Sequence, residues 1–167
     1  IVIEDNEVPY YPIGTVTTFD SNGVGESLGV ECQIGGVVYG VDLRGGNGLQ
    51  FTIIDSTGGI GLFAFNDVSN YVVNEGDSVL ISGTIGQFNG LLQINPDSIQ
   101  FVSANNPLVQ PLTVTTLGEN TESELIRFEN ATLVNPAAWN TGGGSINVEV
   151  TNGADTIAVR IDRDVDI

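Results

Sequence analysis

Apolar and polar residues alternate along residues 76–94, GDSVLISGTIGQFNGLLQI. Val79, Ile81 and Ile85 share one face of an extended strand, because successive side chains of a strand point to opposite sides. The sequence Phe88-Asn89-Gly90 follows, and Asn and Gly accept the positive φ angles of tight hairpin turns. A second apolar run begins directly after the turn. The pattern therefore predicts a β-hairpin that closes a small barrel.

Three strands are predicted upstream of this hairpin. The first covers residues 30–41 and is interrupted by Gly35 and Gly36, because glycines inside a strand often mark the sharp bend of a barrel strand. The second and third cover residues 49–55 and 60–65. Three strands, a connector and two further strands are the element order of a five-stranded OB barrel, so we expect an all-β fold.

Three other segments in this half have weaker patterns. Residues 1–12 are expected to form an extended lead-in to the domain. Residues 13–19 predict either a short strand or the start of a loop. Residues 66–74, which connect the third strand to the hairpin, have room for one short helical turn.

The second half of the chain repeats the first. Residues 147–152 occupy the repeat position of residues 50–55, an offset of 97 (147 − 50). The strand and turn pattern survives at low identity, which favours an internal duplication. At the same offset, residues 157–161 overlay residues 60–64, and Asp164-Val165 overlays Asp67-Val68.

Domain boundaries follow from this repeat. Thr113-Val114-Thr115-Thr116 matches Thr15-Val16-Thr17-Thr18, and the segment between the copies, NNPLVQP, contains two prolines that suit a stiff linker. We predict tandem OB-fold-like five-stranded barrels, the second incomplete. Residues 1–104 form the first with its lead-in, residues 105–111 the linker, and residues 112–167 the second.

The second copy is expected to contain the first three strands only. Ile167 overlays Asn70, so no counterpart of residues 76–94 follows. A barrel without two of its strands has unpaired edges and an open core. Because the sequence starts at Ile1 and contains no Met, we expect a processed protein or an excerpt, and we expect truncation to explain the missing strands. The alternatives are that those strands are disordered or belong to another segment, or that a neighbouring chain donates them.

The charge balance limits the function. The chain has 21 acidic residues, four basic residues that are all arginine, and a net charge of −17. Neutralisation of phosphates by Lys and Arg supplies most non-specific affinity for nucleic acids, so we expect no direct nucleic-acid binding by the chain alone. The acidity is interpreted as a solubility adaptation to a salty exterior. No apolar run approaches the roughly 20 residues of a membrane helix, so no membrane span is expected.

No catalytic set is evident, and we predict that the chain is not an enzyme. The chain has no histidine and no lysine, so acid–base chemistry would need paired carboxylates. Cys32, the single cysteine, lies in a strand-like alternation and has no histidine to activate it. We therefore expect Cys32 to be a buried, inert thiol.

Two stretches of the chain together resemble a known group of proteins. The runs LGVECQIGGVVYGVDLRGGNGLQFTIIDSTGGIGLF and VNEGDSVLISGTIGQFNGLLQI resemble OB-fold domains that accompany secreted bacterial nucleases of the endonuclease/exonuclease/phosphatase type. They are more similar to modules of large Bacteroidetes surface proteins exported by the type IX system. SELIRFENATLV and VRIDRDVDI are similar to the second, degenerate copy of such modules. The resemblance, over residues 13–167, implies a fold and a secretory setting but no activity.

Calcium is the cofactor to consider in such an acidic chain. Asp20, Asn22 and Glu26 place oxygen ligands at intervals along a glycine-containing turn, as hard cations require. The full twelve-residue calcium loop is absent, so an ordinary turn is the expectation and a calcium site the alternative. Asp162, Asp164 and Asp166 also alternate, but the repeat places them in a connector, where we expect them to be solvated.

A ligand-binding face is predicted on the second and third strands, where OB folds commonly bind. Phe63 and Phe65 share one face of the third strand, with Gln50 and Thr52 available on the second. An exposed aromatic pair there could stack on a sugar or a base. We expect instead that both rings pack in the core or against the second copy, because large apolar residues are usually buried.

Trp139 lies in the loop that corresponds to residues 44–48 of the first copy. A tryptophan in such a loop serves either as an anchor between domains or as a binding contact. The sequence leaves both roles open.

The leading functional hypothesis is a non-catalytic module of a secreted or cell-surface protein, used for spacing, adhesion or protein contact. Its partners would be other domains of the same protein or neighbouring copies. One alternative is an accessory substrate-binding domain of an extracellular nuclease. A further alternative is a subunit of an extracellular fibre in which one chain completes the next.

Overall fold

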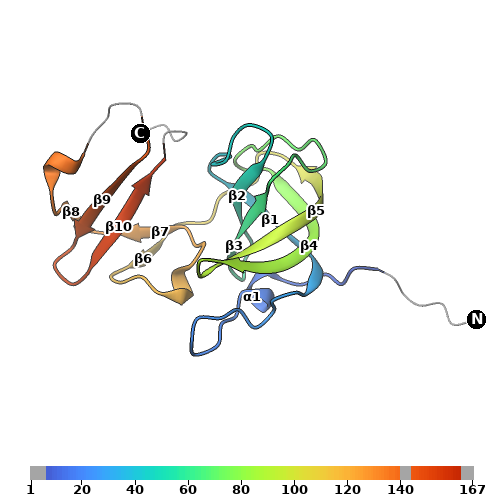
Figure 1. Cartoon of the computed structure of the whole chain (residues 1–167), viewed down its shortest axis with the longest axis horizontal. Coiled ribbons are helices and arrows are strands. Elements are labelled where there is room, and N and C mark those ends of the chain that lie inside the picture. The colour runs from blue at the N-terminus through green and yellow to red at the C-terminus, as the bar shows by residue number, and fades with distance from the viewer. Residues whose placement is uncertain (1–6, 140–143, 163–167) are drawn as a thin grey trace, which may run out of the picture. The chain divides into compact units, whose positions relative to one another are not determined.

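The computed structural model describes residues 7–139 and 144–162 and confirms the all-β class (Figure 1). The chain divides into two compact units, residues 1–108 (unit 1) and residues 109–167 (unit 2). The division falls inside the segment predicted to be a linker. Among the described residues, no helix has the length and apolar character needed to cross a membrane.

Unit 1 contains one closed five-stranded barrel in the order β1-β2-β3-β5-β4. The barrel has the element order predicted from the sequence, and the short helix α1 precedes it. Its elements are α1 (Ile13–Val16), β1 (Glu31–Tyr39), β2 (Leu49–Ile54), β3 (Gly59–Ala64), β4 (Ser78–Phe88) and β5 (Leu91–Ser103).

The predicted hairpin closes this barrel. β4 and β5 pair antiparallel across a turn in which Asn89 and Gly90 have φ angles of 52° and 95°. β4 also pairs with β1, and β5 pairs in parallel with β3, so the hairpin joins the two ends of the three-stranded sheet. β5 continues to Ser103, beyond the predicted end of the hairpin at residue 94.

The bend predicted in the first strand is where β1 changes partners. Residues up to Val37 pair with β4, and residues from Val37 onward pair with β2. A Cβ atom on Gly36 would lie 3.1 Å from the carbonyl oxygen of Ile54. Glycine therefore lets the two backbones approach closely at the bend.

The core of unit 1 consists of the inward-facing residues of all five strands together with α1. Cys32 is among them and is completely buried, as predicted, and burial raises the pKa of its thiol. The buried hydrophobic residues that pack together in this core are Ile13, Val16, Cys32, Ile34, Val38, Leu49, Phe51, Ile53, Ile60, Leu62, Ala64, Val79, Ile81, Ile85, Leu92, Ile94 and Ile99.

Two local predictions for unit 1 were wrong. Residues 13–16 form the helix α1 rather than a strand or loop, and its first turn is held by the β2–β3 turn. The Ile13 N–H donates to Asp55 Oδ2 at 3.0 Å, and the Gly14 N–H donates to Thr57 Oγ1 at 2.8 Å. Residues 66–74 contain no helical turn, and the chain reverses there at Ser69 and Asn70, which both have positive φ.

Unit 2 contains two small sheets. One has the order β10-β9-β8 and the other pairs β6 with β7 in parallel. Its described residues do not form a closed barrel. Its elements are β6 (Leu112–Val114), the 3-10 helix η1 (Glu119–Thr121), β7 (Ile126–Phe128), β8 (Thr132–Leu133), the 3-10 helix η2 (Pro136–Ala138), β9 (Ile146–Thr151) and β10 (Thr156–Ile161).

The two units share strand boundaries and register. β9 begins 97 residues after β2 (146 − 49), and β10 begins 97 residues after β3 (156 − 59). Leu49 lies opposite Ala64 in the β2–β3 pair, and Ile146 lies opposite Ile161 in the β9–β10 pair. The repeat offset predicted from the sequence therefore holds for each end of both strands.

The first segments of the two units also correspond to each other, but the residues that correspond differ from those that the sequence predicts. Val16 belongs to α1, whereas Val114 belongs to β6, so the match of residues 113–116 with residues 15–18 is wrong. The counterpart of β6 is the lead-in, because Tyr10 bridges Gln33 in parallel as Thr113 pairs in parallel with Arg127. The predicted overlay of Asp164-Val165 lies outside the described residues.

Candidate functional site

The loop between β1 and β2 is held against the start of β2. Asp42 Oδ1 accepts hydrogen bonds from the N–H groups of Arg44 at 3.1 Å and Gln50 at 2.9 Å. The Leu43 N–H donates to the carbonyl oxygen of Gln50 at 2.8 Å. These bonds fix the backbone from which the Arg44 side chain projects.

Arg44 lies over two phenylalanine rings. Its guanidinium carbon is 4.9 Å from the ring centroid of Phe63 and 5.2 Å from that of Phe65. The two rings meet edge to face, with centroids 5.0 Å apart and planes at 87°. Both distances suit cation–π attraction, and we call Arg44, Phe63 and Phe65 the Arg44 platform.

The platform is on the outside of the barrel. Phe65 is 73% exposed and Phe63 is half-buried, so the expectation that both rings pack in the core was wrong. Packing of the rings against the second copy, the other expectation, stays a prediction. Alternation along β3 explains this placement, because Ile60 and Leu62 occupy the inward-facing positions and leave the outward positions to the phenylalanines.

The platform adjoins the polar residues that the sequence placed on the second strand. Gln50 lies opposite Phe63 in the β2–β3 register, and Thr52 lies opposite Gly61. Gln50 and Thr52 are half-buried and alternate with the buried residues of β2, so they share the outer face with Phe63. The structure thus brings together four of the five predicted ligand-binding residues and adds Arg44.

Arg44 was not predicted to belong to a site. The sequence contained a signal, because Arg44 is the only basic residue among residues 1–110 and stands in a glycine-rich loop. The fifth predicted residue, Trp139, is in unit 2, follows η2 and is 45% exposed. Its role as an anchor or as a binding contact stays a prediction.

A cavity of about 420 Å³ shares the β1–β2 loop with the platform. Its polar side chains include Asp42, Asp67 and Tyr71. The Tyr71 hydroxyl donates to Asp77 Oδ2 at 3.0 Å, and Asp77 is only 6% exposed. Burial, together with the hydrogen bond to Asp77 and its charge, raises the pKa of Tyr71. The lining residues are Asp42, Gly46, Asn47, Gly48, Leu49, Asp67, Tyr71, Val72 and Val73.

The segment considered for calcium forms a hydrogen-bonded turn. Asp20 Oδ1 accepts from the N–H groups of Asn22 at 2.8 Å and Val24 at 3.0 Å, and Asp20 Oδ2 accepts from the Asn22 side chain at 3.3 Å. The hydrogen bonds from Val24 and Asn22 lower the pKa of Asp20. The choice between an ordinary turn and a calcium site stays a prediction. Glu26 is exposed near this turn. Across residues 7–139 and 144–162, no three histidine, cysteine or carboxylate side chains are grouped so that they could hold a metal ion.

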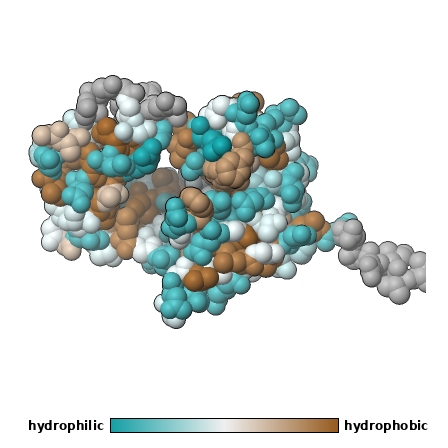
Figure 2. Space-filling view, in the orientation of Figure 1, coloured by the Kyte–Doolittle hydropathy of each residue, from teal (hydrophilic) through white to brown (hydrophobic). Residues whose placement is uncertain are grey.

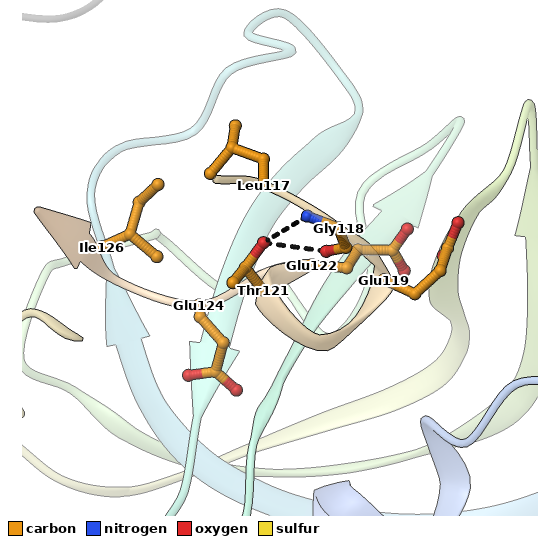
Figure 3. A pocket seen from close by; sticks show the side chains of 7 residues that line it. All are labelled: Leu117, Gly118, Glu119, Thr121, Glu122, Glu124 and Ile126. Carbon is orange, nitrogen blue, oxygen red and sulfur yellow. Dashed lines mark hydrogen bonds between the residues drawn. The ribbon is translucent and has the colours of Figure 1, made fainter. Parts of the chain in front are cut away.

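Unit 2 has a separate pocket of about 410 Å³ between η1 and β7. The Thr121 hydroxyl holds its wall by accepting from the Gly118 N–H at 3.1 Å and donating to the Gly118 carbonyl oxygen at 2.8 Å (Figure 3). Leu117 and Ile126 supply its apolar side chains, and Glu119, Glu122 and Glu124 its carboxylates. The pocket is therefore acidic.

No model of a known protein family matches the chain, and a sequence search finds no match among curated proteins.

Proposed function

We propose that the chain is a non-catalytic contact module of a secreted or cell-surface protein, and that it binds a neighbouring copy or domain through the Arg44 platform. The observation that carries the proposal is the Arg44 guanidinium over two phenylalanine rings, one of which is 73% exposed. Exposed aromatic residues and arginine are the side chains that contribute most to protein interfaces.

Three further features support contact with protein. The bonds from Asp42 to the backbone of Arg44 and Gln50 hold the loop in place, so little conformational entropy is lost when a partner binds. A chain of charge −17 repels polyanions, and the Arg44 guanidinium repels a basic group placed directly over it, so the partner surface is neutral at its centre. The similarity to Bacteroidetes surface modules supports an extracellular setting.

Sedimentation velocity at increasing salt tests the proposal. Two copies of charge −17 repel each other, and salt screens this repulsion, so association through the platform should strengthen as salt rises. Phe65→Ala should weaken the association. Phe88→Ala is the matched control, because Phe88 is also exposed, at 66%, but lies at the end of β4 outside the platform.

Three results would count against this function. Equal weakening of association by Phe65→Ala and Phe88→Ala would remove the platform from the contact. A monomer at every salt concentration would exclude a neighbouring copy as the partner. Hydrolysis of a polymer by the purified chain that a single substitution abolishes would contradict a non-catalytic role.

A second candidate is an accessory domain that holds single-stranded nucleic acid for an extracellular nuclease. It is favoured by the exposed ring of Phe65 beside β2 and β3, because bases stack on such rings. Fluorescence anisotropy with labelled oligothymidine at low salt tests it. Binding should weaken with salt, with a slope of about −0.7 for the one phosphate that Arg44 can neutralise, and should be lost in Phe65→Ala. The opposite salt dependence separates this function from protein contact.

A further inference from the structure

Unit 2 has the inward-facing residues of a barrel, but it buries just one of the nine. Its apolar residues alternate as those of the matching strands in unit 1 do. In β7, Ile126 and Phe128 lie on either side of Arg127. In β1, Cys32 and Ile34 lie on either side of Gln33, the residue that corresponds to Arg127. Val148 is buried, and the other eight are half-buried. The nine residues are Ile126, Phe128, Leu133, Ile146, Val148, Val150, Ile157, Val159 and Ile161.

The matching residues of unit 1 are covered. The inward residues of β2 and β3 are at most 9% exposed, the value for Ala64. The hairpin β4–β5 covers them, and its inward residues Val79, Ile81, Ile85 and Leu92 are each at most 1% exposed. Unit 1 therefore shows which kind of element fits against this sheet and in what register.

Among the described residues of unit 2, both strand edges that the hairpin would need are unpaired. β10 is the edge strand of its sheet, whereas its counterpart β3 pairs with β5. Within the described residues β7 pairs with β6 alone, whereas the start of β1 lies between the lead-in and β4. Figure 2 shows hydrophobic residues at the surface of the part of the molecule that holds β8, β9 and β10. Exposed edges beside an apolar face recruit further strands.

We propose that unit 2 is a binding site for a β-hairpin of the β4–β5 kind. The first strand of the hairpin pairs antiparallel with β7, and the second pairs in parallel with β10 opposite Ala158 and Val159. These two residues correspond to Gly61 and Leu62, which pair with Gln93 and Ile94 of β5. This site is distinct from the Arg44 platform, and the proposal does not rest on the function assigned to that platform.

The chemistry of the hairpin follows from unit 1. Its inward positions carry β-branched or leucine side chains at every second residue, as Val79, Ile81 and Ile85 do. The pocket at the start of β7 is lined by Glu119, Glu122 and Glu124, so the hairpin residue that lies nearest to it is neutral or basic.

An extended chain tests the proposal. Residues 71–103 are appended directly after Ile167, because Ile167 has the repeat position of Asn70 (167 − 97) and the natural spacing is restored. Hydrogen exchange of backbone amides is measured in the original and the extended chain. The amides of β7 and β10 should become protected by roughly tenfold or more in the extended chain, because a paired amide exchanges only after local opening.

A second readout is the single tryptophan. Trp139 belongs to unit 2, so its fluorescence during denaturation reports the unfolding of that unit. The transition should move to higher denaturant in the extended chain. In the control, the appended copies of Val79, Ile81 and Ile85 are changed to Ser, and neither protection nor the transition should shift. The amides of β1 to β5 report in every sample that unit 1 is folded.

Two outcomes would overturn the proposal. In one, the amides of β7 and β10 exchange equally fast with the apolar hairpin and with the serine control. In the other, the original chain is already a dimer whose β10 amides are protected, which would assign this edge to a second copy rather than to a hairpin.

Discussion

Units 1 and 2 contain the same three-stranded arrangement in the same register, yet unit 1 has a closed core and the described residues of unit 2 do not form one. The β2–β3 pair and the β9–β10 pair have corresponding strand ends. Leu49 lies opposite Ala64 in the first pair and Ile146 opposite Ile161 in the second, and the pairings that follow correspond residue by residue. In unit 1 the hairpin β4–β5 lies over this sheet, and in the described part of unit 2 no such hairpin does. Matching strands thus form in both units, and their inward residues are fully covered in the unit where the hairpin lies over them.

The strongest test of this difference in burial is to make the same substitution in both units. Ile60 and Ile157 occupy equivalent positions, and Ile60 is fully buried whereas Ile157 is half-buried. Ile60→Ala should lower the free energy of unfolding of unit 1 by about 2–5 kcal/mol, because it removes a side chain and leaves a cavity.

Ile157→Ala should lower the stability of unit 2 by roughly 1 kcal/mol only, because its side chain gives up less contact and leaves no closed cavity. Denaturant titrations followed by circular dichroism for unit 1 and by Trp139 fluorescence for unit 2 measure both. Equal losses would mean that the two cores are equally closed.

The order of unfolding tests the same difference without any substitution. Unit 2 should unfold at lower denaturant than unit 1, so that the Trp139 transition precedes the main circular dichroism transition. In native conditions the amides of β10 should exchange at least roughly tenfold faster than those of β3, because β10 is an edge strand. Coincident transitions would show that the units unfold as one.

Tyr71 gives unit 1 a pH dependence that unit 2 should lack. The pKa of Tyr71 is raised in the folded state, mainly by burial and then by Asp77. Its stabilising effect is therefore fully present below about pH 10, where unfolded tyrosine ionises, and is lost as pH rises through the folded pKa. The stability of unit 1 should fall above pH 10.

Tyr71→Phe should reduce this alkaline loss. The variant also removes the hydroxyl that donates to Asp77 at 3.0 Å, so we expect unit 1 to lose about 1–3 kcal/mol near neutral pH. Denaturant titrations at neutral and alkaline pH measure both effects. An unchanged alkaline slope in Tyr71→Phe would mean that Tyr71 is not the source of the pH dependence.

Much of this fold follows from sequence patterns, because alternation and turn residues act locally. The hairpin turn at Asn89-Gly90 and the 97-residue offset of β9 and β10 are examples. The helix α1 was missed because four residues are too few to show a helical period. Thr113–Thr116 was aligned wrongly with Thr15–Thr18 because similar tetrapeptides adopt different structures when their tertiary contacts differ. In Thr15–Thr18, Val16 is buried in the barrel core.

The candidate site was predicted only in part. Alternation indicated that Phe63 and Phe65 share a face, but it could not tell which face of β3 points inward. That choice depends on the other strands, which enclose Ile60 and Leu62. The contact of Arg44 with the rings joins the β1–β2 loop to the end of β3. The bond between Tyr71 and Asp77 links two residues of the β3–β4 connector that stand six positions apart. Neither follows from an alternation or a turn pattern.

Substitutions on the outer faces of the two units are expected to change stability least. At the repeat positions of Phe63 and Phe65, unit 2 has Arg160 and Asp162, which form an ion pair at 3.3 Å. Arg160 is 61% exposed, so Arg160→Ala should change the stability of unit 2 by no more than about 0.5 kcal/mol. Phe65→Ala should likewise cost unit 1 less than about 1 kcal/mol, because the ring is exposed and loses mainly its cation–π contact. Titrations followed by Trp139 fluorescence and circular dichroism measure the two changes. A larger loss in Phe65→Ala would mean that the platform stabilises the barrel and would weaken its assignment to binding.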